Sequence, residues 1–125
     1  MAWKISGDLP ISQQLYAKLQ TDILSGVYPP GSQFPPVRKL AMDHSVNPNT
    51  MQKVMGLLES EGLLLCSSTA GRFVTEDQAL LLKKKKQLQE SFLKEALAEA
   101  RVLGIDKEQM TDFVLNHFDE SEENL

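Results

Sequence analysis

The chain has 125 residues, of which 42% are hydrophobic and 24% charged, a composition that is ordinary for a globular protein and that allows a buried core. No apolar run approaches the roughly 20 residues that a membrane span needs, and the N-terminus lacks the charged-then-apolar order of a signal peptide. Because Cys66 is the only cysteine, no internal disulfide can form, and we expect a cytoplasmic protein. The length allows one compact domain, or a small domain with an appendage.

The net charge of −4 is distributed unevenly along the chain. Residues 1–75 carry six Lys or Arg and five Asp or Glu, whereas residues 76–125 carry seven and twelve. Proteins that bind nucleic acid usually present a basic surface, so the total charge argues mildly against that class. The near-neutral first part could contact DNA only through a few well-placed basic side chains.

The first predicted helix begins at Pro10, because proline is tolerated in a first helical turn. Its apolar residues recur every four positions and share one face: Ile11, Leu15, Leu19 and Ile23. Gly26 ends this pattern, and the segment Tyr28-Pro29-Pro30-Gly31 cannot continue a helix. We therefore expect a helix between Pro10 and Gly26, followed by a loop.

Two further helices are predicted on either side of a short turn. The second helix runs from Val37 to about His44, and Ser45-Val46 form the turn. Asn47 is a good N-cap for the third helix, since its side-chain oxygen can accept backbone N–H groups of the first turn, and Pro48 needs no donor there. The third helix ends at Gly62, and its apolar residues lie on one face: Met51, Val54, Met55 and Leu58.

A β-hairpin is predicted after the third helix. The apolar run Leu63–Cys66 and the β-branched and aromatic run Phe73–Thr75 are typical of two strands, with the tip near Ala70-Gly71. The order helix, helix, turn, helix, hairpin is that of a winged helix-turn-helix. We therefore predict a mainly α fold with a small β-hairpin, and we assign this domain to residues 1–75.

Residues 76–125 are predicted to form a helical tail. Residues 78–103 contain no glycine or proline and form one long helix, Gly104 breaks it, and Asp106 caps a last helix. Two amphipathic helices cannot bury their apolar faces alone, so they should pack on the first domain, on a second copy, or on both. The apolar residues assigned to dimerisation are Leu88, Phe92, Leu93, Ala96, Leu97, Met110, Phe113 and Val114.

Several short motifs follow one another at characteristic intervals between residues 9 and 74. They are Pro10–Leu15, Ile23–Gly26, Pro30–Pro35, Pro36–Ala41, Val46–Met51, Leu58–Leu63 and Gly71–Val74. Each motif alone is a weak signal, but together they resemble the GntR family of bacterial regulators. The variant Val46-Asn47-Pro48-Asn49-Thr50-Met51 is similar to that of its short YtrA-type branch. Residues 76–125 fit this branch by length and helicity, without a motif.

The sequence departs from the family pattern at a few positions. Pro36 stands where the family usually has a small N-cap serine, and His44-Ser45 replace its usual turn. The segment Thr69–Arg72 lacks the first glycine of the family's Gly-x-Gly wing tip, and Arg72 stands where threonine or serine is usual. The fold expected from the resemblance is unchanged, and the geometry of the wing is the feature most affected.

The exposed face of the third helix is the main candidate for DNA contact. Asn49, Gln52 and Lys53 lie opposite its apolar face, and asparagine and glutamine side chains can pair with adenine edges. Thr50 can bind a phosphate or contact a thymine methyl group, and we include the cap residue Asn47 among the candidates. The alternative is a solvated polar face, which any amphipathic helix presents. The resemblance implies DNA contact.

Basic side chains before the third helix are further candidates. The resemblance implies that Arg38, early in the second helix, contacts DNA, whereas the alternative is a surface salt bridge with Asp43 or Glu59. Lys39 beside it is a weaker candidate, as a neighbour of a phosphate or as a solvated side chain.

The wing and the start of the tail carry candidates with two open interpretations. Arg72 could enter a minor groove, or it could be a strand residue facing water. Gly71 serves a turn in either case, and the resemblance implies that it allows close approach to the DNA backbone. The run Lys83–Lys86 could bind nucleic acid, but we favour a solvated helix segment balanced by Glu90 and Glu95.

Catalysis and metal binding have no support in the sequence. No Ser/His/Asp set, phosphate loop or paired-histidine motif is present, and we expect neither enzymatic activity nor a cofactor. The group of His117 with Asp112, Asp119 and Glu120 follows no known ligand spacing. Cys66 is interpreted as a small hydrophobic residue of the hairpin.

Two hypotheses of function remain after these observations. The first, which the resemblance implies, is a transcriptional repressor that binds an inverted-repeat DNA operator as a homodimer. Whether a small-molecule effector binds at the dimer interface is left open. The second is a winged-helix module that binds a protein partner, which the acidic charge supports. The polar first turns of the third helix favour the first hypothesis, since protein interfaces concentrate aromatic and large apolar residues at their centres.

Overall fold

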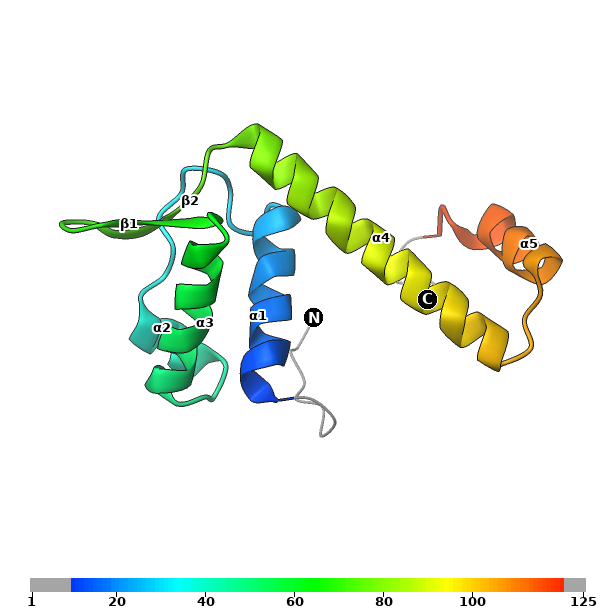
Figure 1. Cartoon of the computed structure of the whole chain (residues 1–125), viewed down its shortest axis with the longest axis horizontal. Coiled ribbons are helices and arrows are strands. Elements are labelled where there is room, and N and C mark those ends of the chain that lie inside the picture. The colour runs from blue at the N-terminus through cyan, green and yellow to red at the C-terminus, as the bar shows by residue number, and fades with distance from the viewer. Residues whose placement is uncertain (1–9, 121–125) are drawn as a thin grey trace. The chain divides into compact units, whose positions relative to one another are not determined.

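The computed structural model describes residues 10–120, so residues 1–9 of the predicted first domain and residues 121–125 of the predicted tail lie outside the described part. The element order is α1 (Ile11–Leu24), α2 (Val37–Asp43), α3 (Pro48–Ser60), β1 (Leu64–Ser67), β2 (Gly71–Val74), α4 (Gln78–Val102) and α5 (Lys107–His117) (Figure 1). This confirms the mainly α fold with a small hairpin. The chain divides into two compact units, Met1–Lys85 and Lys86–Leu125, so that the unit boundary falls within α4. The domain boundary predicted after residue 75 lies before α4.

The helix ends follow from local sequence signals. Asn47 caps α3 through its side-chain oxygen, and Pro48 occupies the first helical position. Asp106 caps α5 in a reciprocal arrangement with Gln109, in which each side chain accepts the backbone N–H of the other residue. α3 ends before Gly62, whose φ of +79° is a left-handed conformation that glycine adopts without strain.

The core of the first unit is built around α3, which packs against α1, α2 and β1. α1 and α3 lie side by side in Figure 1, with α2 beside α3. α1 and α3 contribute the apolar positions that the sequence predicted, except that Ile11 is 42% exposed, and α2, the loop before it and both strands add further side chains. The buried side chains are Leu15, Leu19, Ile23, Phe34, Leu40, Ala41, Met51, Val54, Met55, Leu58, Leu63, Leu64 and Val74.

The hairpin is antiparallel and pairs Leu64 with Val74 and Ser67 with Gly71. Residues 31–34, predicted from the sequence as part of a loop, run along β2 and add backbone hydrogen bonds on its other side. The N–H of Phe34 donates to Arg72 O at 2.7 Å, and the N–H of Val74 donates to Ser32 O at 2.9 Å. β2 is therefore hydrogen-bonded along both edges, to β1 on one side and to residues 31–34 on the other, which stabilises the wing.

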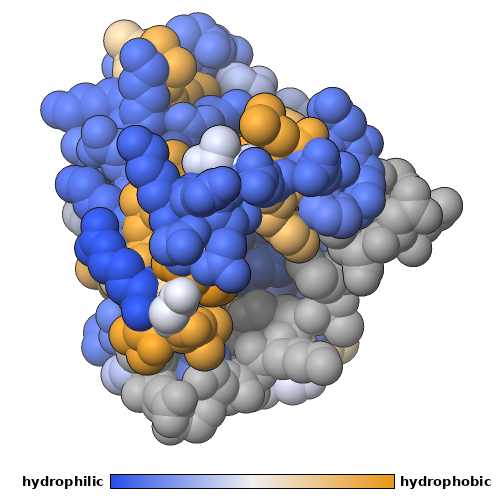
Figure 2. Space-filling model, turned by 90° about the vertical axis from the view of Figure 1, so that its right-hand side faces the viewer, coloured by the Kyte–Doolittle hydropathy of each residue, from blue (hydrophilic) through white to orange (hydrophobic). Residues whose placement is uncertain are grey.

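The second unit contains the rest of α4 and α5, joined through Gly104, whose φ is +75°. Among its described residues only Ala100 is buried, while large apolar side chains remain exposed. Figure 2 shows hydrophobic side chains in orange at the surface between hydrophilic ones in blue. The exposed apolar residues of this unit are Phe92, Leu93, Leu97, Val102, Leu103, Ile105, Phe113, Val114, Leu115 and Phe118. None of the helices in the described part is both long and apolar enough to cross a membrane.

Candidate nucleic-acid interface

α3 has one buried apolar face and one exposed polar face. The apolar side chains are 0% exposed: Met51, Val54, Met55 and Leu58. Asn49, Gln52 and Lys53 are exposed, and Thr50 is half-buried. A helix about 10–12 Å across fits the major groove of B-DNA, about 12 Å wide, where the polar side chains of its first turns can meet base edges. The structure thus presents on the solvent side of α3 the polar side chains that the sequence singled out.

Asn47 stabilises the start of this helix. Its Oδ1 accepts the N–H of Asn49 at 2.7 Å, and its backbone oxygen accepts the N–H of Met51 at 3.1 Å. The exposed side chain of Asn47 therefore uses its oxygen for the cap, and its amide nitrogen is the group that remains for a phosphate.

The two basic residues of α2 differ in their surroundings. Lys39 pairs with Asp43 at 3.0 Å, in an ion pair whose side chains are 63% and 47% exposed. An exposed pair of this kind contributes little free energy, about 0–1 kcal/mol, so Lys39 can exchange its partner at small cost. Arg38 is exposed and pairs with no carboxylate among residues 10–120. Both carboxylates considered for it, Asp43 and Glu59, are engaged by other basic residues.

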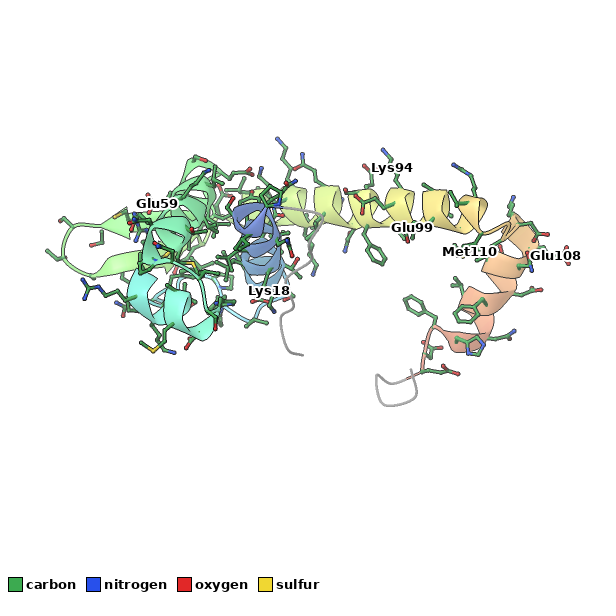
Figure 3. The ribbon with its side chains drawn as sticks, turned by 90° about the horizontal axis from the view of Figure 1, so that it is seen from below. Lys18, Glu59, Lys94, Glu99, Glu108 and Met110 are labelled. Atoms are coloured by element: carbon green, nitrogen blue, oxygen red, sulfur yellow. The ribbon has the colours of Figure 1, made fainter. Side chains whose placement is uncertain are left out.

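The structure gives Arg72 a partner that was not considered from the sequence. Its guanidinium group donates to the carboxylate of Glu59 in the last turn of α3, and its side chain is only 19% exposed. Figure 3 shows Glu59 on α3 close to the hairpin. The ion pair ties β2 to α3. The interpretation of Arg72 as a strand residue that faces water is therefore wrong, because the pair with Glu59 holds its side chain against α3.

The wing tip is exposed and has a second brace. Gly71 has a φ of +81°, which explains the glycine at this turn. The side-chain Nε2 of Gln33 donates to the backbone oxygen of Ala70 at 2.8 Å. Sequence reasoning did not single out Gln33, because the contact joins residues that are 37 positions apart.

The lysine run at the start of α4 is only partly solvated. Lys83, Lys85 and Lys86 are exposed, but Lys84 is half-buried and donates to the carboxylate of Glu61, where α3 ends. Glu61 also accepts a hydrogen bond from the Tyr16 hydroxyl on α1. The hydrogen bond from Lys84 is the largest effect, followed by that from Tyr16, and together they hold the pKa of Glu61 below its ordinary value. The pKa of Tyr16 is raised, chiefly by burial and next by its contact with Glu61. No local pattern of residues predicts this contact, because its three residues lie far apart along the chain.

Other reactive side chains form no site in the described part of the chain. No group of three or more His, Cys, Asp or Glu side chains there could hold a metal ion. His117 contacts Glu120 at 2.9 Å and stacks on Phe113, with ring centroids 4.3 Å apart. Cys66 lies in β1, within the hairpin as the sequence predicted, and its side chain is exposed.

Comparison with known proteins gives a match to a family of regulators. Residues 11–74 match the gntR family of bacterial regulatory proteins, a segment that begins with α1 and ends with β2. Over 106 residues the chain is 28% identical to the HTH-type transcriptional repressor YtrA of Bacillus subtilis, covering 84% of this chain and 82% of that protein.

Solved structures share the fold as well. A GntR family transcriptional regulator from Listeria monocytogenes superposes with a TM-score of 0.80 at 27% identity, covering 90% of this chain and 98% of that one. The DNA-binding domain of AraR in complex with an operator superposes with a TM-score of 0.52 at 27% identity, covering 60% of this chain and 90% of that one. The first similarity covers more of the chain than the first unit contains, and the second covers a shorter part.

Proposed function

Since this chain belongs to the gntR family of bacterial regulatory proteins, we propose that it is a cytoplasmic transcriptional repressor that binds an inverted-repeat DNA operator as a homodimer. The observation that carries the proposal is the polar, exposed face of the first turns of α3, opposite four fully buried side chains. A winged helix-turn-helix places this helix in the major groove. The operator complex of the similar AraR domain supports this mode of binding.

Each polar residue of α3 has a role that its chemistry suits. Asn49 and Gln52 would read base edges, because their amide groups donate and accept hydrogen bonds at once. Lys53 and Thr50 would bind phosphates, and the positive end of the helix dipole at Asn47 would favour a phosphate as well. Base contacts would set the sequence preference, and phosphate contacts would set the register.

Basic residues outside α3 would add contacts to the DNA backbone. Arg38 pairs with no carboxylate in the described residues, so its charge is available to a phosphate. Lys39 would exchange Asp43 for a phosphate. Gly71 at the wing tip would allow close approach of the wing, and Arg72 would hold the wing against α3 through Glu59.

The homodimer is supported by the apolar side chains that the tail leaves exposed. Of the eight residues assigned to dimerisation from the sequence, Phe92 and Phe113 are the most exposed, at 68% and 61%. A soluble protein rarely leaves so many large apolar side chains in water, and a second copy would cover them. Two α3 helices would then enter successive major grooves, about 34 Å apart, which requires a two-fold operator.

Repression is supported by the similarity to YtrA, which is named a transcriptional repressor. A dimer on an operator that overlaps a promoter would exclude RNA polymerase from it. This mechanism needs only occupancy of the DNA and no chemical step by the protein.

The experiment is selection of duplexes from a random library by the full chain at near-physiological salt, with the mass in solution measured alongside. Enrichment of an inverted repeat, together with twice the monomer mass of 14.0 kDa, is the expected result. Affinity should fall steeply as salt rises, because bound phosphates release counterions. A folded dimer that enriches no duplex would contradict DNA binding and favour the protein-partner hypothesis.

A further inference from the structure

Gly56 occupies the interior of α3, a position that disfavours glycine. Because glycine lacks Cβ, its backbone loses more conformational freedom on folding than that of any other residue, and the helix is less stable than with alanine. A glycine in the middle of a helix therefore calls for a reason, either in the fold or in what the helix contacts.

The described residues give no reason within the fold. Gly56 is not among the glycines with a positive φ, so no turn requires it. A Cβ built at Gly56 would meet no atom within 4 Å, so no neighbouring element packs closely against its α-carbon. An alanine at this position would fit the described structure of the single chain without any shift.

Gly56 lies on the same face as side chains proposed to contact DNA. It follows Asn49 by seven residues and Lys53 by three, and residues at these intervals lie on one side of an α-helix. All three residues are exposed, whereas Met55, which precedes Gly56, and Leu58, two positions after it, are buried. Gly56 therefore lies on the side of α3 that points away from the core.

We infer that Gly56 lets duplex DNA come close to the backbone of α3, an inference that rests on the proposed function. A helix about 10–12 Å across with its side chains nearly fills a major groove about 12 Å wide. Without a side chain at residue 56, α3 can lie deeper in the groove, and Asn49 and Gln52 can reach the base edges. A methyl group there stabilises the free protein and holds the helix away from the DNA.

The test compares stability and affinity in the full chain with Gly56→Ala. Thermal unfolding should show a higher Tm, while anisotropy with the selected duplex should show binding weakened about tenfold, as for a steric clash at a packed contact. Gly56→Gln should bind still more weakly, since its side chain is longer. The matched control is Ala17→Gly at an exposed position in α1, which should lower Tm and leave the affinity unchanged.

Each other outcome overturns the inference in a recognisable way. If Gly56→Ala raises Tm and binds the duplex as tightly as the wild type, DNA does not approach this position. If Gly56→Ala lowers Tm, the fold itself requires the glycine. A wild-type chain that selects no duplex overturns the proposed function and this inference together, and that result is seen before any variant is made.

Discussion

Lys84 of α4 donates a hydrogen bond to the carboxylate of Glu61, the residue that caps the C-terminal end of α3. The same carboxylate accepts the hydroxyl of Tyr16, whose oxygen in turn accepts from Gln20 Nε2 at 3.4 Å. One carboxylate thus joins α1, the end of α3 and the first turns of α4. Leu81, packed against the core, lies in these same turns of α4, so the first unit includes the start of the long helix.

The pH dependence of stability should reveal this contact. The pKa of Glu61 is lowered in the folded protein, chiefly by Lys84, so its ionised form stabilises the fold above its ordinary pKa of 4.5. This stabilisation is lost as the pH falls through the lowered value in the folded state. Glu61→Gln should therefore lower Tm at neutral pH by a few degrees, corresponding to about 1 kcal/mol or less, and flatten the decline of Tm in acid.

The control for this experiment is Glu90→Gln. Glu90 is an exposed carboxylate of α4 that forms no ion pair among the described residues. This variant should follow the wild-type profile of Tm against pH. Identical acid profiles for Glu61→Gln and the wild type would contradict the role assigned to Glu61.

Arg38→Ala and Gln52→Ala should affect DNA binding in different ways. Because each protomer of the dimer loses one phosphate contact, Arg38→Ala should weaken binding to all duplexes and reduce the slope of log affinity against log salt by about 1.8. Loss of Gln52 should relax the preference at one base pair of each half-site, worth about 1–3 kcal/mol per pair, with the salt slope unchanged. Duplex selection and salt titration of both variants measure these two effects. Negligible effects in both variants would contradict the placement of α3 in the major groove.

The ion pair between Arg72 and Glu59 allows a test of what Arg72 does. If Arg72 holds the wing on α3, Glu59→Ala and Arg72→Ala should each weaken operator binding and speed hydrogen exchange in the hairpin. The double variant should lose little more than either single variant, because the two side chains act as one contact. If Arg72 instead enters the minor groove, Glu59→Ala frees it and binding becomes tighter, which would contradict the bracing role.

The dimer interface is tested by a charge placed on the exposed face of α5. Phe113→Asp should move the sedimentation profile toward monomer, because an unpaired carboxylate in an apolar interface costs several kcal/mol. Binding to the two-fold operator should weaken in parallel, since one α3 would then bind alone. Val27→Asp, at a residue of the first unit that is 62% exposed, is the matched control and should stay dimeric.

The sequence by itself determined the helices, the hairpin and the polar face of α3. These features depend on local signals: the cap at Asn47, the glycine at Gly62 and the three-to-four-residue spacing of apolar side chains. Helix capping and amphipathic spacing act between residues a few positions apart, so they can be found along the chain. The candidate residues Asn49, Gln52 and Lys53 followed from the same periodicity.

Only the tertiary structure decided which partner each charged side chain has. The pair of Arg72 with Glu59 joins residues 13 positions apart, and that of Lys84 with Glu61 joins residues 23 apart. Likewise, the strand-like pairing of residues 31–34 with β2 depends on how the chain returns to the hairpin. No local spacing specifies such contacts, because they exist only once the core has packed α1, α3 and the hairpin together.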